Sequence, residues 1–80
     1  MKPSILVVDD EPGVRTTLEA VLRDEGYQVE AVESGEACLA RVTRGAFDVI
    51  VLDIWLPGID GLQTLARLRE RQIDTQVVII

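Results

Sequence analysis

The chain has 80 residues, of which 14 are acidic and 8 are basic, and its formal net charge is −6. Hydrophobic residues make up 48% of the sequence, which is enough for a packed core and argues against a disordered chain. The acidic balance argues against nucleic acid or an anionic membrane as a direct partner of this segment. No stretch approaches the roughly 18 consecutive apolar residues of a membrane-spanning helix.

Cys38 is the single cysteine, so an internal disulfide is excluded. It falls within a helical pattern, where a cysteine more often serves as a small buried apolar residue than as a reactive thiol. A lone cysteine and the absence of a signal-peptide pattern favour a reduced, cytoplasmic setting.

The first part of the chain alternates between strand and helix patterns. Residues 4–8 predict a strand, because the unbroken apolar run Ile5-Leu6-Val7-Val8 is typical of a strand that is buried on both faces. Pro12 is suited to open a helix and Gly26 to end it. Residues 27–32 alternate in polarity and predict a more exposed strand at an edge of the sheet. The predicted buried stripe of the helix consists of Val14, Leu18, Val21 and Leu22.

The middle of the chain repeats this pattern. Ser34 is a favourable N-cap for a second helix, which we expect to end near Gly45. Residues 48–52 are the most apolar strand pattern and are therefore predicted to lie at the centre of the sheet. Asp60 and Gln63 have the spacing of a capping box at the start of a third helix. Its predicted buried stripe is Leu62, Leu65 and Leu68.

Residues 76–80 predict a fourth strand, because four of them, Val77-Val78-Ile79-Ile80, are β-branched. Alternating strands and helices favour an α/β fold with right-handed crossovers and a parallel sheet. A hydrophobic parallel strand needs cover on both faces, so we expect residues 1–80 to be a truncated part of a longer protein.

Carboxylates follow two of the predicted strands. Asp9 and Asp10 come directly after the first strand, and Asp53 follows the third. Ligands of open parallel sheets bind outside the carboxyl ends of the strands. If these two strands are neighbours, the three carboxylates meet there, where they could bind a hard cation and one could act as a nucleophile. Alternatively, Asp9 and Asp10 could cap the first helix, and Asp53 could be a turn residue before Pro57 and Gly58.

Three separated motifs together resemble the receiver domain of two-component response regulators. They are the run Ile5-Leu6-Val7-Val8-Asp9-Asp10-Glu11-Pro12, the aspartate at position 53, and Leu56-Pro57-Gly58-Ile59-Asp60-Gly61. Residues 53–58 also resemble the version found in enhancer-binding transcriptional activators of the nitrogen-regulation group. The resemblance implies a flavodoxin-like doubly wound sheet. Residues 1–80 would then be the N-terminal part of a single receiver domain, with strand order 2-1-3-4 and without an effector domain.

The resemblance also implies roles for individual residues. Asp53 would accept a phosphoryl group from a sensor histidine kinase. Asp9, Asp10 and Asp53, with the backbone carbonyl of Trp55, would bind Mg²⁺. Such a domain is a signalling switch and not a turnover enzyme. The family carries a Ser or Thr at the end of the fourth strand and a Lys at the end of the fifth; the chain, which stops at Ile80, includes neither.

Other functions remain open on the sequence alone. A phosphohydrolase of the haloacid-dehalogenase type needs an Asp-x-Asp motif that residues 9–12 do not provide. A nucleotide-binding enzyme is disfavoured as well, because the sequence has no glycine-rich phosphate loop. A receiver-like fragment that is not phosphorylated could act as a docking or self-association module. Because an uncovered strand over residues 76–80 is a template for pairing, we expect the chain to self-associate as a dimer or larger species. By family analogy, exposed side chains of Arg15, Thr16 and Glu19 would face the kinase.

Overall fold

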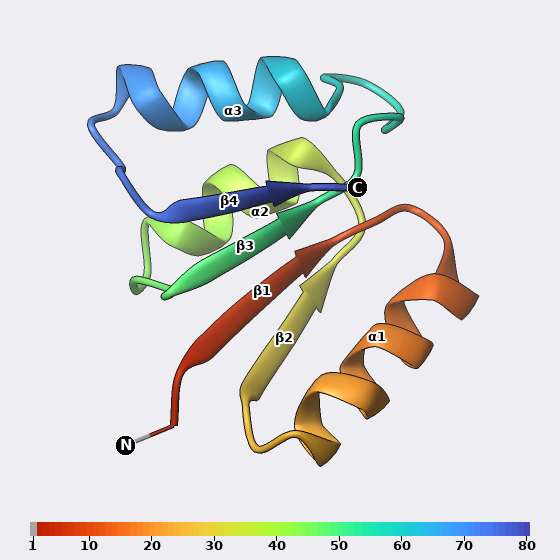
Figure 1. Ribbon diagram of the computed structural model, residues 1–80. Coiled ribbons are helices and arrows are strands. Elements are labelled where there is room, and N and C mark those ends of the chain that lie inside the picture. Colours follow the sequence, from red (N-terminus) through yellow and green to blue (C-terminus); the bar gives the residue numbers. More distant parts are fainter. Residues whose placement is uncertain (1) are drawn as a thin grey trace.

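A computed structural model describes residues 2–80 as a four-stranded parallel sheet with helices on both faces (Figure 1). The elements are β1 (Ser4–Val8), α1 (Pro12–Asp24), β2 (Gln28–Val32), α2 (Gly35–Val42), β3 (Val49–Leu52), α3 (Gly61–Glu70) and β4 (Gln76–Ile79). The strand order is β2-β1-β3-β4, and every pair is parallel. The α/β fold, the strand order, the edge position of β2 and the inner position of β3 are thereby confirmed.

The two faces of the sheet are covered by different helices. Helix α1 lies on one face, beside β1 and β2, whereas α2 and α3 lie on the other (Figure 1). The buried cluster on the α1 side is Ile5, Val7 and Val29, packed by Leu18 and Leu22 of α1. The larger cluster, under α2 and α3, consists of Leu6, Val8, Cys38, Leu39, Phe47, Ile50, Leu52, Leu56 and Leu68. Most of the core therefore lies between the sheet and the α2–α3 pair.

The helix termini follow the local signals in the sequence. Ser34 accepts a hydrogen bond from the Ala37 amide at 3.0 Å, as an N-cap does. Asp60 and Gln63 exchange side-chain to backbone hydrogen bonds in a complete capping box. Gly26, at φ 95°, ends α1 in the left-handed region that glycine tolerates.

Between residues 2 and 80, no helix combines the length and the apolarity that crossing a bilayer requires.

Two side chains that were predicted to be buried are exposed. Val21 is 53% exposed and Leu62 is 55% exposed. Helix α1 covers only part of its sheet face, so Leu18 and Leu22 pack there and Val21 does not. Helix α3 instead buries Gly61, Thr64 and Leu68, which recur at helical spacing. The predicted burial is confirmed for Leu68, and Leu65 is partly buried against the core, so Leu62 is the one wrong member of the predicted stripe. Gly61 and Thr64 are not hydrophobic, so a count of apolar positions misses them.

Strand β4 forms one edge of the sheet that residues 2–80 build. Its described hydrogen-bonded neighbour is β3, and Val78 faces the α1 side beside Val51. Val78, Ile79 and Ile80 are 44%, 39% and 49% exposed, respectively. Apolar surface is therefore accessible along β4.

Candidate functional site

Strands β1 and β3 are neighbours whose carboxyl ends lie at the same level. Val8 is the register partner of Leu52, so the residues that follow, Asp9 and Asp53, leave the sheet side by side. The Asp53 amide donates to the Val8 carbonyl at 3.0 Å, and the Asp9 amide donates to the Val32 carbonyl of β2 at 3.1 Å. The backbone at both aspartates is thus anchored to the sheet.

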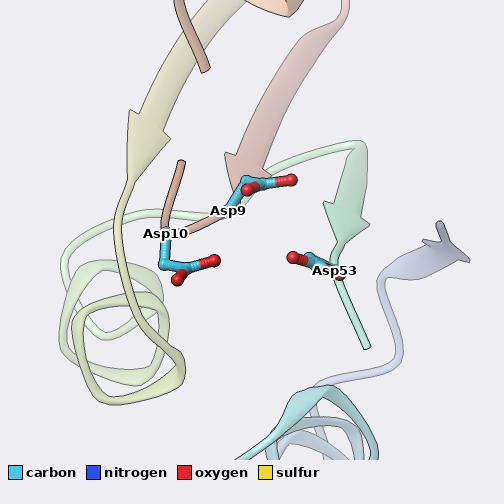
Figure 2. A group of neighbouring side chains, drawn as sticks. All are labelled: Asp9, Asp10 and Asp53. Atoms are coloured by element: carbon cyan, nitrogen blue, oxygen red, sulfur yellow. The ribbon is translucent and has the colours of Figure 1, made fainter. Parts of the chain in front are cut away.

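Asp9, Asp10 and Asp53 form a cluster of carboxylates that we call the acidic cluster (Figure 2). One oxygen from each side chain lies within 4.8 Å of the other two. Asp9 is buried, with 5% of its surface exposed, whereas Asp53 is half-buried and Asp10 is exposed. The acidic cluster therefore has a buried side at Asp9 and a solvent-facing side at Asp10.

Asp9 and Asp53 each use one carboxylate oxygen in a local turn. The Glu11 amide donates to Asp9 Oδ1 at 2.9 Å, and the Trp55 amide donates to Asp53 Oδ1 at 3.1 Å. In both cases the donor lies two residues after the aspartate, which is the arrangement of an Asx turn. The Oδ2 atom of each aspartate accepts no hydrogen bond from residues 2–80 and is available for another partner.

Basic side chains do not neutralise the acidic cluster. Within residues 2–80, the ion pairs are Arg23–Glu19 and Arg41–Glu30, neither of which includes a cluster aspartate. Three carboxylates at this separation repel one another, and a cation would relieve that repulsion. Mg²⁺ prefers a few carboxylate oxygens together with water, so a partly exposed carboxylate set suits it.

Helix capping does not explain the acidic residues that follow β1. The N-cap of α1 is Glu11, and its side chain makes no capping hydrogen bond. The carboxylate of Asp10 accepts no hydrogen bond from residues 2–80, and that of Asp9 binds the amide of the N-cap residue and not one inside the helix. The alternative in which Asp9 and Asp10 serve only as caps is therefore wrong.

Trp55 lies in the loop after β3, with its side chain in solvent. Trp55 is 80% exposed. Its amide orients the Asp53 carboxylate, as described above. The indole is the only tryptophan side chain in the sequence and lies two residues from Asp53, so its fluorescence can report on the acidic cluster.

The loop after Asp53 is held against the start of α3. The Gly61 amide donates to the Ile54 carbonyl at 3.0 Å. A Cβ on residue 61 would lie 2.7 Å from Ile54 Cα and would overlap the Asp53 carbonyl oxygen. Position 61 therefore requires glycine, because the backbone of Asp53 and Ile54 leaves no room for a Cβ.

Arg15 contributes to the site in a way that the sequence did not indicate. Expected in solvent, it is half-buried, and its Nη1 donates to the Asp9 carbonyl at 2.8 Å. Glu19 is also half-buried and pairs with Arg23, whereas Thr16 is exposed as expected. The predicted exposure is therefore wrong for Arg15 and Glu19. Side chains on a helix point back toward its N-terminus. The position of Arg15 in the first turn of α1 is therefore the one signal from which its contact with the preceding turn could have been predicted.

Comparison with known proteins places this chain in one family. The family model for the response regulator receiver domain matches residues 5–80. The chain belongs to the response regulator receiver domain family. Its members are signalling modules, so the chain is a signalling domain and not a turnover enzyme.

Relatives within the family include transcriptional regulators. The chain is 43% identical over 76 residues to the transcriptional regulatory protein TcrA of Mycobacterium tuberculosis, covering 95% of this chain and 30% of TcrA. It therefore spans about 30% of the length of that curated relative. The NtrX structure from Brucella abortus is 34% identical, with a TM-score of 0.90, over 99% of this chain and 18% of NtrX.

One relative has been solved in two informative complexes. The response regulator TrrA of Thermotoga maritima, in complex with Mg²⁺ and BeF, is 40% identical with a TM-score of 0.91. The match covers 99% of this chain and 68% of TrrA. TrrA in complex with the histidine kinase ThkA is 40% identical with a TM-score of 0.90, covering 99% of this chain and 67% of TrrA.

Proposed function

We propose that this receiver domain accepts a phosphoryl group on Asp53 with the help of Mg²⁺ bound at the acidic cluster. The observation that carries the proposal is the convergence of three carboxylates, within 4.8 Å, at the ends of two neighbouring strands. The match to TrrA, whose structure contains Mg²⁺ and BeF, supports the assignment. Residues 1–80 would form part of a single receiver domain in a longer protein.

The donor set would consist of three carboxylates and one main-chain group. Asp9, Asp10 and Asp53 would each supply a carboxylate oxygen, and Trp55 its backbone carbonyl. When bound, Mg²⁺ supplies positive charge that offsets the repulsion among the carboxylates and the phosphoryl oxygens. The exposed position of Asp10 leaves room for the water ligands that Mg²⁺ retains.

Asp53, which is more accessible than the buried Asp9, would act as the nucleophile. The Trp55 amide holds Oδ1, so Oδ2 would attack the phosphorus of a phosphohistidine. A new O–P bond forms while the P–N bond breaks, and its electron pair leaves with the imidazole nitrogen. Phosphoryl transfer has a loose transition state, so positioning and charge stabilisation dominate the catalysis. The product is an acyl phosphate on Asp53.

The phosphoryl donor would be a sensor histidine kinase. The ThkA–TrrA structure contains a related response regulator in complex with a histidine kinase, which supports this proposal. Exposure of Asp10 and Trp55 leaves one side of the acidic cluster open to a partner. A role in transcription regulation, by analogy with the transcriptional regulatory protein TcrA, belongs to this proposal. We also propose a cytoplasmic location.

The intact mass after incubation with acetyl phosphate and Mg²⁺ tests the proposal. We expect the mass of one phosphoryl group to be added to the parent chain and to Asp60→Asn, which keeps an N-cap residue on α3. Asp53→Asn should gain nothing, and a chelator should abolish the gain in the parent chain. A folded parent chain that gains no mass, or an equal gain in Asp53→Asn, would contradict the proposal.

Self-association is a second candidate function, and a different observation favours it. The outer edge of β4 has no strand partner within residues 2–80, and Val78, Ile79 and Ile80 are partly exposed beside it. Apolar edge strands pair readily with other chains. We expect the 80-residue chain to form dimers or larger species, and Val78→Lys to shift them toward monomer. Light scattering that reports a monomer at every concentration would exclude this function.

A further inference from the structure

We infer that Arg15 is a positioning residue for the cation site, an inference that rests on the proposed binding of Mg²⁺. Its Nη1 donates to the main-chain carbonyl of Asp9 at 2.8 Å. Among the basic side chains of residues 2–80, Arg15 alone hydrogen-bonds to a member of the acidic cluster. It does so without touching a carboxylate, so it acts through the backbone.

The Arg15 hydrogen bond completes the restraint of Asp9. The Asp9 amide is bound to the Val32 carbonyl, and Asp9 Oδ1 is bound by the Glu11 amide. With Arg15 on the Asp9 carbonyl, Oδ2 is the one polar atom of Asp9 that lacks a partner within residues 2–80. The Arg15 amide also donates to the Glu11 carbonyl at 3.0 Å. The amide bond is an ordinary hydrogen bond at the start of α1, whereas the side chain of Arg15 links the first turn of α1 to Asp9, the residue that follows β1.

This restraint matters because the carboxylates must hold one arrangement to share a cation. If the guanidinium is removed, the turn at residues 9–11 gains conformational freedom, which cation binding must then remove. Loss of a group that orients metal ligands usually weakens metal binding by 10- to 100-fold. Arg15 acts on the main chain of a ligand residue, so we expect a loss of about tenfold, at the lower end of that range.

A purely electrostatic role for Arg15 predicts the opposite result. A guanidinium beside the site repels an incoming divalent cation, so removal of its charge would tighten binding. The direction of the change in Mg²⁺ affinity therefore separates positioning from simple charge repulsion.

Arg23 provides a matched control on the same helix. Its Nη2 donates to the Val29 carbonyl at 3.0 Å, again six residues away in the sequence. Arg23→Met removes the same charge and the same kind of hydrogen bond at the other end of α1, together with the ion pair to Glu19. It leaves the contacts of the acidic turn in place.

The test is a Mg²⁺ titration of the parent chain and the variants, followed by Trp55 fluorescence. We expect the dissociation constant to rise about tenfold in Arg15→Met. It should recover partly in Arg15→Lys and stay within about twofold of the parent in Arg23→Met. Urea unfolding of each variant gives its stability. Amide exchange at Glu11, measured without Mg²⁺, should accelerate in Arg15→Met and stay unchanged in Arg23→Met.

Each remaining outcome would overturn the inference for a different reason. Unchanged or tighter Mg²⁺ binding in Arg15→Met would exclude a positioning role. If Arg23→Met weakens Mg²⁺ binding equally, the effect arises from a general loss of stability. If Arg15→Met does not fold, Arg15→Lys decides the question. A Mg²⁺ affinity of Arg15→Lys equal to that of the parent chain, together with unchanged amide exchange at Glu11, would exclude the positioning role. A parent chain that shows no response to Mg²⁺ would overturn the proposed function itself, and this inference with it.

Discussion

Gly35, at the start of α2, lies directly against the side chain of Thr64 in α3. A Cβ on residue 35 would overlap Thr64 Oγ1 and would lie 2.8 Å from Ile59 Cγ1. Thr64 is fully buried, and its hydroxyl donates to the Asp60 carbonyl at 2.7 Å. This close contact sets the distance between the two helices and holds in place the loop that leads from Asp53 to α3.

Gly35→Ala should therefore destabilise the fold by about 1 to 3 kcal/mol, the usual cost of overpacking. Adding Thr64→Ala removes the overlapping hydroxyl, so the double variant should be more stable than the sum of the two single effects predicts. We expect an interaction energy of at least about 0.5 kcal/mol in a double-mutant cycle measured by urea unfolding. Strict additivity would mean that the two residues do not constrain each other.

Gly61→Ala should impair both stability and the site. The added Cβ meets the backbone of Asp53 and Ile54, which cannot move away as a side chain could. We expect a loss of about 2 kcal/mol or more, together with weaker Mg²⁺ binding as the Asp53 backbone shifts. Gly13→Ala is the control, because a Cβ there meets no atom within 4 Å. It should stabilise α1 by up to about 1 kcal/mol. Similar losses of stability and of Mg²⁺ affinity in Gly61→Ala and Gly13→Ala would contradict this prediction.

Asp10→Asn should have opposite effects with and without Mg²⁺. Asp10 is exposed and makes no hydrogen bond within residues 2–80, so removing its charge relieves repulsion at little cost. Without metal, we expect stabilisation by up to about 1 kcal/mol. At Mg²⁺ a hundredfold above its dissociation constant, the parent chain should gain about 2.7 kcal/mol, and the variant much less.

Thermal or urea unfolding in chelator and in Mg²⁺ measures both effects of Asp10→Asn. Asp74→Asn serves as a control for a generic change of surface charge, because Asp74 is exposed and lies outside the acidic cluster. An equal response to Mg²⁺ in the parent chain and in Asp10→Asn would remove Asp10 from the site.

Burial raises the pKa of the Cys38 thiol to about 11. A thiol that is not buried ionises at lower pH, with a pKa of 9.0. The stabilisation from the neutral buried thiol is therefore complete below that pH and is lost as the pH rises through about 11. We expect the parent chain to lose about 2 to 3 kcal/mol more than Cys38→Ala over this range.

Urea unfolding of the parent chain and Cys38→Ala at a series of pH values measures this difference. The same burial predicts that a thiol reagent will modify Cys38 at neutral pH only after unfolding, since the thiolate is the reactive form. Parallel pH profiles, or rapid modification of the folded chain, would contradict the buried neutral state.

The sequence predicted the sheet well because its signals are local. Apolar runs mark β1 and β3, and cap residues such as Asp60 mark where helices begin. Parallel strands then require their carboxyl ends to share one edge, which is why Asp9 and Asp53 were expected to be neighbours. The roles assigned to these aspartates remain predictions until phosphorylation and Mg²⁺ binding are measured.

Features that depend on contacts between distant segments were missed. Val21 and Leu62 satisfy helical periodicity, but burial depends on how far a neighbouring element extends over each helix face. Thr64 is buried because α2 approaches α3 at a glycine, and Thr64 is not hydrophobic. Arg15 reads as a solvated charge, and only the folded turn shows that its guanidinium reaches a carbonyl.

The matching Asx turns at Asp9 and Asp53 have a consequence for which aspartate accepts the phosphoryl group. Both turns leave an Oδ2 atom without a hydrogen bond from residues 2–80, so local conformation alone would make the two aspartates equivalent acceptors. Their surroundings differ, because Asp9 is 5% exposed and Asp53 is half-buried. A bulky phosphoryl donor can approach Asp53 more readily than Asp9. Under the proposed function, steric access therefore decides which of two similarly held carboxylates is modified.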